Sequence, residues 1–235
     1  MIDELAAAPG LLIASDFDGT LSEIVEDPDL AVPLARSKAA LEALARLEGT
    51  AVAIISGRRR ADLANRFDPS FVLIGEHGAD HGLTTGPETV ALTRARDLVD
   101  EAVQVTPGSR AEHKSRSVGF HYRLVPDPEE IVERLRRQAF EIEGIEILEG
   151  KMILELTDSP VSKGMALAAL KRSLGVERVV FMGDDVTDES AFAVLEDGDV
   201  GIHVGPGPTG AEVTVPDPSA LADLLEALLA ARSAR

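Results

Sequence analysis

Residues 11–20 read LLIASDFDGT, and this stretch decides the expected fold class. Its first half is an apolar run of strand length, and its second half places Asp16 and Asp18 where that strand ends. Residues i and i+2 of an extended chain face the same way, so the two carboxylates can aim at one point. Gly19 relaxes the backbone directly after them. Two like charges this close need a compensating cation, proton or lysine, which predicts chemistry at this strand end.

Apolar strands and amphipathic helices alternate around this stretch and again near the end of the chain. Continuous apolar strands that alternate with helices are typical of a parallel sheet covered on both faces. The expected strands are 11–15, 51–55, 71–74, 178–182 and 199–204, and the expected helices are 33–47, 59–67, 163–174, 189–195 and 219–231. The sequence therefore predicts an α/β fold with a doubly wound parallel sheet core.

The middle of the chain follows a different pattern. Residues 117–123 and 152–156 alternate apolar and polar side chains, which indicates strands with one solvated face. With strands near 111–114 and 145–148 and helices at 92–103 and 128–142, the block reads αββαββ. We therefore expect an inserted α/β domain at 87–158 that interrupts a core domain formed by 1–86 and 159–235.

Composition narrows the possible partners. The chain of 235 residues carries a net charge of −18, which argues against binding nucleic acid. It contains no Cys and shows neither a signal peptide nor an apolar run of membrane-spanning length, so a cytoplasmic protein that avoids membranes is expected, acting as a monomer. A phosphorylated substrate would need a locally positive site in this acidic chain.

Three further clusters lie at expected strand ends or helix starts. Residues 56–58 (SGR) open a helix, where a hydroxyl and free backbone N–H groups favour an anion. Lys163 opens the helix after the insertion and offers a point charge to a phosphate. Residues 183–189 (GDDVTDE) follow a strand with clustered carboxylates that suit Mg²⁺. Taken singly, these clusters equally fit a turn, a helix cap or a solvated face, but their shared sheet edge favours one site.

The four clusters together resemble the motifs of the haloacid-dehalogenase-like superfamily of phosphotransferases, and the resemblance covers the whole chain. The matching stretches are DFDGT, the serine of SGR, the lysine of SKG and GDDxTD. The resemblance implies that Asp16 is the nucleophile that forms an aspartyl-phosphate, and that Asp18 donates and then accepts the proton. It also implies a Mg²⁺ ion held by Asp16, the Asp18 carbonyl and Asp184 with support from Asp188, and a phosphoryl group bound by Ser56, Gly57, Arg58 and Lys163.

Longer stretches are similar to trehalose-6-phosphate phosphatases, a family within that superfamily. They are DFDGTLSEI, GEHGADH, EHKSRSVGFHYR, EGKMILEL and GDDVTDESAF. The resemblance implies that the αββαββ insertion is a cap that closes over a phosphorylated disaccharide. The implied substrate-binding residues are His77, Glu112, Lys114, His121, Arg123 and Glu155.

The charged residues of the insertion also fit a structural interpretation without a binding role. His121 and Arg123 lie two positions apart on an expected strand, so they share a face that could simply be solvated. The other histidines, His81, His113 and His203, are expected in loops or at the surface.

Several other functions also fit parts of the pattern. A phosphatase for sucrose phosphate, mannosylglycerate phosphate or a related glycoside phosphate fits the same motifs. A receiver-like signalling module also combines an acidic Mg²⁺ pocket with a lysine, but it needs neither Asp18 nor an insertion. A phosphomutase and an inactive sugar-binding relative fit less well, because all four catalytic motifs are filled and no group is dedicated to a bisphosphorylated intermediate.

Overall fold

The computed structural model describes residues 1–25, 27–80, 88–150, 152–158 and 162–235. The chain divides into two compact units, which are treated separately below. Unit 1 comprises Met1–Gly82 and Val161–Arg235, and unit 2 comprises Leu83–Pro160. The expected domain boundary between residues 86 and 87 falls outside the described residues, and so does residue 159, which begins the second part of the expected core.

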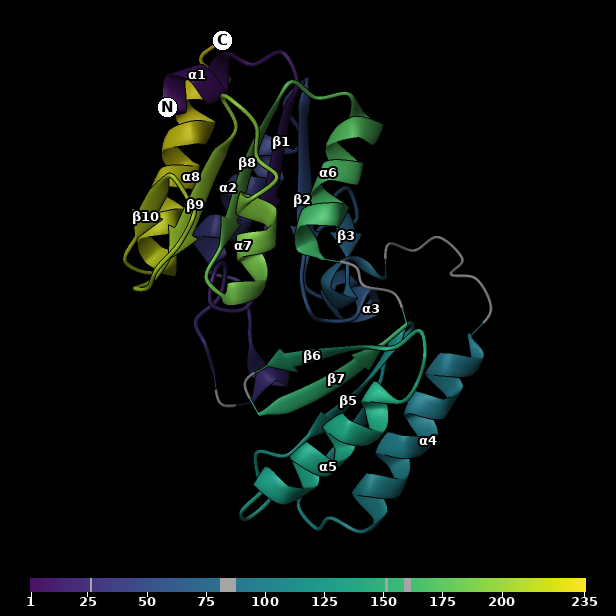
Figure 1. Cartoon of the computed structure of the whole chain (residues 1–235). Helices are drawn as coiled ribbons and strands as arrows, with labels where there is room; N and C mark the ends of the chain where they lie inside the picture. The colour runs from purple at the N-terminus through teal and green to yellow at the C-terminus, as the bar shows by residue number, and fades with distance from the viewer. Residues whose placement is uncertain (26, 81–87, 151, 159–161) are drawn as a thin grey trace. The chain divides into compact units, whose positions relative to one another are not determined.

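Unit 1 is built on a six-stranded parallel sheet with the strand order β10-β9-β8-β1-β2-β3 (Figure 1). β1 lies inside the sheet, and all five of its residues are buried. Its last residue, Ser15, pairs with Ile54 on one side and Met182 on the other. The strands are β1 (Leu11–Ser15), β2 (Thr50–Ile55), β3 (Val72–Ile74), β8 (Arg178–Gly183), β9 (Val200–Val204) and β10 (Val213–Val215).

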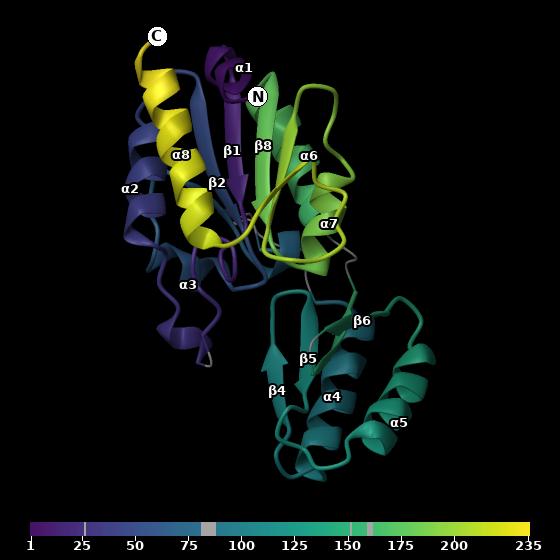
Figure 2. The ribbon, with the colours of Figure 1, turned by 90° about the vertical axis from the view of Figure 1, so that its left-hand side faces the viewer.

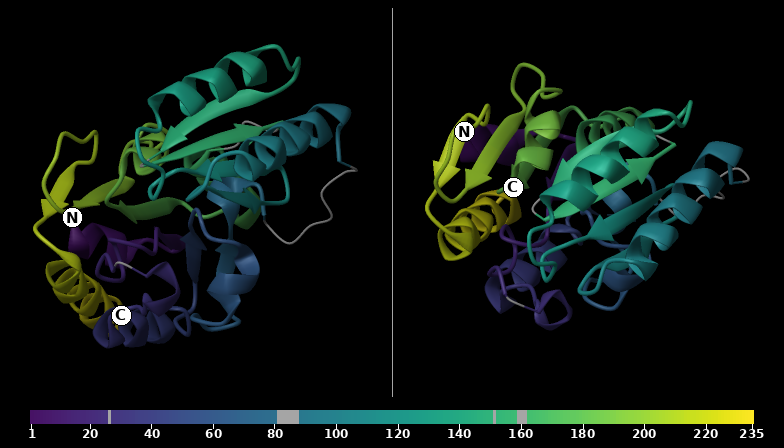
Figure 3. Two further views of the ribbon diagram at one scale, coloured as in Figure 1. Left: turned by 90° about the horizontal axis from the view of Figure 1, so that it is seen from below. Right: turned by 60° about the horizontal axis from the view of Figure 1, so that its bottom comes forward.

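Helices cover both faces of this sheet. Apolar side chains of α1 (Ile2–Ala7), α2 (Ala35–Leu44), α3 (Arg60–Ala64) and α8 (Pro218–Ser233) share one buried cluster with the sheet. Side chains of α6 (Lys163–Leu174) and α7 (Val186–Phe192) share another cluster, and Figure 2 shows these two helices across the sheet from α2 and α8. The first helix also packs against the last, which brings the two ends of the chain into one layer (Figure 3).

The strand order reverses between β1 and β8. The chain winds outward from β1 through β2 to β3, and later from β8 through β9 to β10. Loops that follow two adjacent strands on opposite sides of such a reversal splay apart and leave room for a ligand at the carboxyl ends. The doubly wound parallel core expected from the sequence is therefore confirmed, and Asp16 and Asp184 follow the two strands at the reversal.

Unit 2 is a four-stranded antiparallel sheet with the order β4-β5-β7-β6 and two helices packed on one face (Figure 1). Its elements in chain order are α4 (Val90–Gln104), β4 (Arg110–His113), β5 (Ser117–His121), α5 (Glu129–Phe140), β6 (Glu146–Gly150) and β7 (Ile153–Thr157). Val118, Phe120, Leu154 and Leu156 point toward the helices and are buried. The αββαββ order is confirmed, and Glu112, His121 and Glu155 lie on the other face of the sheet.

Several local expectations were wrong. The helix expected at 189–195 is α7, which begins at Val186, because Asp185 serves as its N-cap. β5 ends at His121, so Arg123 lies in the following turn and does not share a strand face with His121. His203 is not a surface residue, since it lies in β9 and only 4% of it is exposed. His81 lies outside the described residues.

Four short elements were not expected: α1, β10 and the 3-10 turns η1 (Pro28–Leu30) and η2 (Glu76–Gly78). None of the helices within the described residues is long and apolar enough to cross a membrane.

Candidate active site

Three carboxylates and one lysine meet at the carboxyl ends of β1 and β8. One oxygen each from Asp16, Asp184 and Asp188 lies within 4.8 Å of the others. Lys163 Nζ is 3.1 Å from Asp16 Oδ1 and 2.8 Å from Asp188 Oδ1. The side chains of Lys163 and Asp188 are 2% and 0% exposed. One buried lysine therefore contacts two of three clustered carboxylates. The sequence pattern predicted that these four residues lie at one sheet edge, but not these contacts.

Asp188 shapes this cluster through the first turn of α7. Its Oδ2 accepts hydrogen bonds from the backbone N–H groups of Asp184 and Asp185, each at 3.1 Å. Asp185 caps the helix in return, so the two residues form a capping box. Because Asp188 Oδ1 also accepts from Lys163, this side chain fixes the loop that carries Asp184 and orients the lysine.

Gly19 and Thr20 hold Asp184 from the β1 side. Gly19 has φ +80°, and a Cβ there would lie only 2.1 Å from Asp184 Oδ2, so the position requires glycine on two grounds. Thr20 Oγ1 donates a hydrogen bond to Asp184 Oδ1 at 3.0 Å. The stretch DFDGT thus supplies the nucleophile candidate together with the contacts that position a carboxylate 168 residues later in the chain.

The electrostatics of the cluster favour a bound cation. Burial raises the pKa of Asp16 to about 8, with Asp188 and Asp184 adding to the rise and Lys163 opposing it. Burial also raises the pKa of Asp184 to about 6. Burial alone would lower the pKa of Lys163, but Asp16 and Asp188 raise it above its ordinary value. Three carboxylates against one lysine leave negative charge uncompensated, and oxygen-only donors of this kind suit Mg²⁺.

The stretch from Ser56 to Arg58 is braced by η2. His77 N–H donates to Ser56 O at 2.9 Å, and Glu76 N–H donates to Arg58 O at 2.8 Å. Glu76 and His77 have positive φ, +51° and +56°, a conformation that non-glycine residues seldom adopt. The His77 ring lies so close to Gly57 that a Cβ at Gly57 would be 2.7 Å from it. His77 therefore lies beside the expected phosphate loop.

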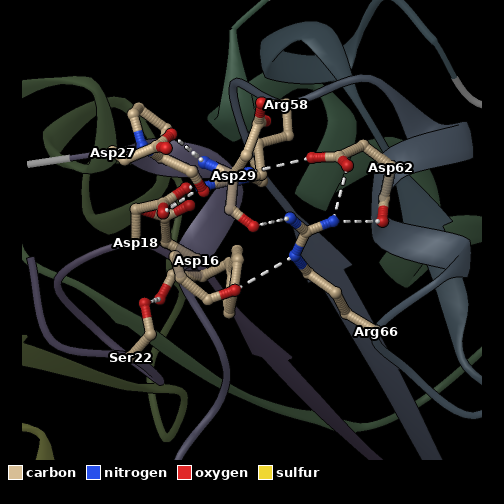
Figure 4. A network of polar contacts seen from close by, with 12 residues as sticks. Asp16, Asp18, Ser22, Asp27, Asp29, Arg58, Asp62 and Arg66 are labelled. Carbon is tan, nitrogen blue, oxygen red and sulfur yellow. Dashed lines mark hydrogen bonds and ion pairs between the residues drawn. The ribbon is translucent and has the colours of Figure 1, made fainter. Parts of the chain in front are cut away.

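Arg58 forms an ion pair with Asp18. The sequence motif had instead predicted that Arg58 binds a phosphoryl group. Arg58 Nε is 2.6 Å from Asp18 Oδ2, and its NH2 is 2.7 Å from Asp18 Oδ1 (Figure 4). The Asp18 carboxylate does not belong to the acidic cluster found among the described residues. The sequence pattern placed Asp18 near the nucleophile correctly, but it gave no sign that Arg58 would bind this carboxylate.

Unit 2 carries its own polar cluster. Lys114 Nζ lies 3.1 Å from both carboxylate oxygens of Glu155, and Ser117 Oγ donates to the same carboxylate at 2.5 Å. His121 Nε2 is 2.8 Å from Glu112 Oε2. This contact with His121, aided by Lys114 and opposed by burial, lowers the pKa of Glu112 to about 2. Four of the expected sugar-binding residues therefore form two pairs in unit 2, whereas Arg123 lies outside β5.

Sequence reasoning missed several residues that shape these sites: Phe17, Thr20, Asp62, Arg66 and Ser117. Thr20 and Phe17 lie inside a motif that was already quoted, so only their roles were missed. Asp62 and Arg66 follow Arg58 at intervals of four residues, the spacing at which oppositely charged side chains meet on a helix. That spacing was a usable signal for the network around Arg58.

A family model described as trehalose-phosphatase matches residues 14–219 of this chain. The chain belongs to the trehalose-phosphatase family. It is 34% identical over 208 residues to the trehalose-6-phosphate phosphatase of Escherichia coli, covering 83% of this chain and 78% of that protein. It is 31% identical over 226 residues to a "Probable trehalose-phosphate phosphatase" of Sinorhizobium fredii, covering 91% of this chain and 85% of that protein.

Solved structures agree with the fold of this trehalose-phosphatase family member. The C-terminal domain of the Candida albicans trehalose-6-phosphate phosphatase superposes with a TM-score of 0.79 at 23% identity, covering 97% of this chain and 95% of that one. At this identity the likeness supports the haloacid-dehalogenase-like fold alone. Family membership identifies the chain as a phosphatase.

Proposed function

We propose that this phosphatase hydrolyses trehalose 6-phosphate to trehalose and phosphate, with Mg²⁺ as cofactor and an aspartyl-phosphate intermediate on Asp16. Family membership and similarity to trehalose-6-phosphate phosphatases support the substrate. The observation that carries the mechanism is the buried cluster of Asp16, Asp184 and Asp188, in which Lys163 contacts two carboxylates.

Asp16 is the best-placed nucleophile in unit 1. Its side chain is 8% exposed and contacts Lys163 directly. It lies at the carboxyl end of β1, a central strand of the sheet. In the proposed first step an Asp16 carboxylate oxygen bonds to phosphorus while the bond from phosphorus to the sugar oxygen breaks. Asp18 gives its proton to the departing sugar oxygen, because an alkoxide is a poor leaving group.

Water completes the reaction in the second step. Asp18 accepts a proton from the water as the water oxygen bonds to phosphorus and the Asp16–phosphorus bond breaks. Lys163 compensates charge on the phosphoryl oxygens and on Asp16 through both steps, and Ser56 with the backbone of Gly57 would bind the same oxygens. The products are inorganic phosphate, the free sugar and the original Asp16 carboxylate.

A divalent cation fits the remaining charge. We propose that Asp16, Asp184 and the backbone carbonyl of Asp18 would hold Mg²⁺, with Asp188 orienting the loop. When bound, Mg²⁺ supplies positive charge that neutralises the carboxylates and the phosphoryl oxygens. Chelation is expected to abolish phosphate release, and added Mg²⁺ is expected to restore it. Full activity after exhaustive chelation would contradict this part of the proposal.

We propose that the polar face of unit 2 recognises the sugar. Glu112, Lys114, His121 and Glu155 offer charged donors and acceptors to hydroxyl groups, and they already hold one another in place. His77 and Arg123 complete the expected set, although Arg123 lies in a turn after β5. Because these side chains hold one another in place, binding a sugar would order few further rotamers and would cost little conformational entropy.

The decisive experiment compares phosphate release from trehalose 6-phosphate, glucose 6-phosphate, sucrose phosphate and mannosylglycerate phosphate. A kcat/KM for trehalose 6-phosphate well above the others is expected. Equal values on all four substrates would overturn the substrate assignment but leave the phosphatase mechanism in place. Light scattering of the same preparation would test the expectation of a monomer.

A further inference from the structure

We propose that Arg58 is a positioning residue that orients Asp18 for proton transfer, and that it does not serve as a phosphate ligand. This inference rests on the proposed function, because it concerns the residue assigned there as proton donor and acceptor. It also replaces the role that the sequence motif suggested for Arg58. Four features of unit 1 support it: a two-point contact with Asp18, a second carboxylate, an aromatic ring beneath the guanidinium and backbone carbonyls that accept from it.

The two-point contact fixes the Asp18 carboxylate in rotation as well as in position. Arg58 Nε and NH2 each donate to a different oxygen of Asp18, at 2.6 and 2.7 Å. A planar guanidinium that meets a carboxylate in this way restrains the plane of the carboxylate, which a single hydrogen bond does not. The Asp18 side chain is 41% exposed, so without Arg58 it would sample several rotamers.

A second carboxylate holds Arg58 itself. Arg58 NH1 donates to Asp62 Oδ2 at 2.9 Å, and Asp62 Oδ1 accepts from Arg66 at 2.5 Å (Figure 4). The contacts with these two arginines lower the pKa of Asp62, although burial opposes that shift. Because Asp62 binds Arg58 independently of Asp18, the guanidinium keeps its place while the Asp18 carboxylate engages a substrate.

Phe17 forms a floor beneath the two arginines. The guanidinium carbon of Arg58 lies 5.0 Å from the centroid of the Phe17 ring, and that of Arg66 lies 6.0 Å from it. The ring is fully buried and packs edge-on against Phe67 at a centroid distance of 5.3 Å. The residue between the two catalytic aspartates thus supports the cation that orients the second of them.

Backbone carbonyls in η1 and at its C-cap accept further hydrogen bonds from the two arginines. Arg58 NH2 donates to Pro28 O at 2.5 Å, and Arg66 donates to Ala31 O and Asp29 O at 3.2 and 3.1 Å. Four of the five N–H groups of the Arg58 guanidinium therefore donate to protein acceptors. A phosphate that bound Arg58 through two N–H groups would have to displace at least one of these contacts, whereas a positioning residue keeps both of its contacts with Asp18.

The test compares two leaving groups in single-turnover phosphoryl transfer. p-Nitrophenolate is a stable anion that departs without a proton, whereas the trehalose oxygen needs one. Arg58→Gln is expected to slow transfer from trehalose 6-phosphate about 10- to 100-fold, part of the roughly 100- to 10,000-fold that a positioned proton donor supplies. Transfer from p-nitrophenyl phosphate should change by less than about 3-fold, because that step draws nothing from the donor.

Arg66→Gln is the matched control, since Arg66 shares Asp62 and Phe17 with Arg58 but does not touch Asp18. It is expected to lower stability without selecting between the two substrates. Arg58→Lys keeps a charge but loses the two-point contact, so it should reproduce the selective loss, and it serves as the test if Arg58→Gln does not fold. Thermal unfolding of each variant establishes that it is folded.

Equal slowing on both substrates with a raised KM would overturn the proposal, because it would show that Arg58 binds phosphate. Unchanged transfer from both would also overturn it. Asp16→Asn separates this result from the proposed function, since it must abolish transfer from both substrates if the aspartyl-phosphate mechanism holds. If the wild type prefers another sugar phosphate, the substrate assignment fails and the Arg58 comparison is run on that sugar.

Discussion

At the scale of single residues, Asp16 combines deep burial with a negative charge that its surroundings only partly compensate. A group whose folded pKa lies above its unfolded value stabilises the fold fully below the unfolded pKa and loses that contribution as pH rises toward the folded one. For Asp16 the ordinary value is 3.8 and the folded value about 8. Metal-free protein should therefore lose stability across this interval as pH rises.

This loss can be measured against Asp16→Asn, which removes the titrating group. In chelator, the unfolding free energy of the wild type should fall relative to the variant by up to about 1.4 kcal/mol per pH unit between about pH 5 and 7. Urea unfolding at three pH values gives the two slopes. Added Mg²⁺ should flatten the wild-type slope. Parallel wild-type and variant curves in chelator would contradict the claim that burial raises the pKa of Asp16.

His203 offers a second prediction at this scale. It is 4% exposed, it packs against Phe192, and neither ring nitrogen has a hydrogen-bond partner within the part of the chain that the structure describes. A buried polar group left unsatisfied costs about 1–3 kcal/mol. His203→Leu should therefore be neutral or stabilising by up to about 2 kcal/mol in thermal unfolding.

The exposed His113 provides the comparison for that variant. His113→Leu acts at an exposed position, where it removes a contact with Asp100, and should change stability by less than about 1 kcal/mol. If His203→Leu destabilised the protein by more than His113→Leu, the buried ring would have to make a polar contact that stabilises the fold.

At the scale of elements, the first turn of α7 joins the fold to the site. Asp188→Ala removes two backbone hydrogen bonds, one of which is half of the capping box, and one of the two carboxylates on Lys163. A loss of about 2–4 kcal/mol is expected from the cap and the broken buried ion pair. Chemical denaturation with Mg²⁺ present checks the value.

Ser162→Ala is the matched variant, since Ser162 caps the neighbouring helix α6 through one hydrogen bond to Met165 N–H at 3.2 Å. It should cost only about 1 kcal/mol. A cost for Asp188→Ala no larger than this would mean that the side chain acts as a helix cap and nothing more.

At the scale of the whole molecule, Arg232 joins three distant parts of unit 1. From the last helix it donates to Leu5 O, Ala6 O and Ala8 O at the end of α1, and to Gly49 O and Thr50 Oγ1 at the start of β2. It is 8% exposed, and burial lowers its pKa below the ordinary value. Carbonyl dipoles thus take the place of a carboxylate partner among the contacts described.

Arg232→Met should therefore destabilise the protein by about 3 kcal/mol or more, because several buried carbonyls lose their donor. Loosening of α1 would also make the first ten residues more sensitive to protease. Arg235→Met, three residues later and exposed, is the control and should change little. Equal stability and equal protease sensitivity of the two variants would refute the proposal that Arg232 links α8 to α1 and β2.

Periodicity and motif spacing predicted the elements that bury an apolar face over many residues. The parallel core, the αββαββ block and the meeting of Asp16, Lys163, Asp184 and Asp188 all follow from where apolar runs end. Elements of three to six residues, such as α1 and β10, carry too few apolar positions to show a period. They form because the larger body holds them.

Side-chain partners were harder to predict than side-chain positions. The pattern located Arg58 beside the site correctly, yet its choice of Asp18 depends on Phe17, Asp62 and η1, which meet only in the folded chain. Arg123 was misplaced because alternation continues in the sequence past His121, where the strand stops pairing. Registers and rotamers are set by tertiary packing, and local sequence does not encode them fully.

The burial of β1 has one more consequence. A strand that is paired on both edges and covered on both faces exchanges its amide hydrogens for deuterium only through global unfolding of unit 1. Three-residue edge strands such as β3 and β10 exchange through local opening. The residue proposed to attack phosphorus thus follows the slowest-exchanging strand, and local opening of the edge strands does not change the position of its carboxylate.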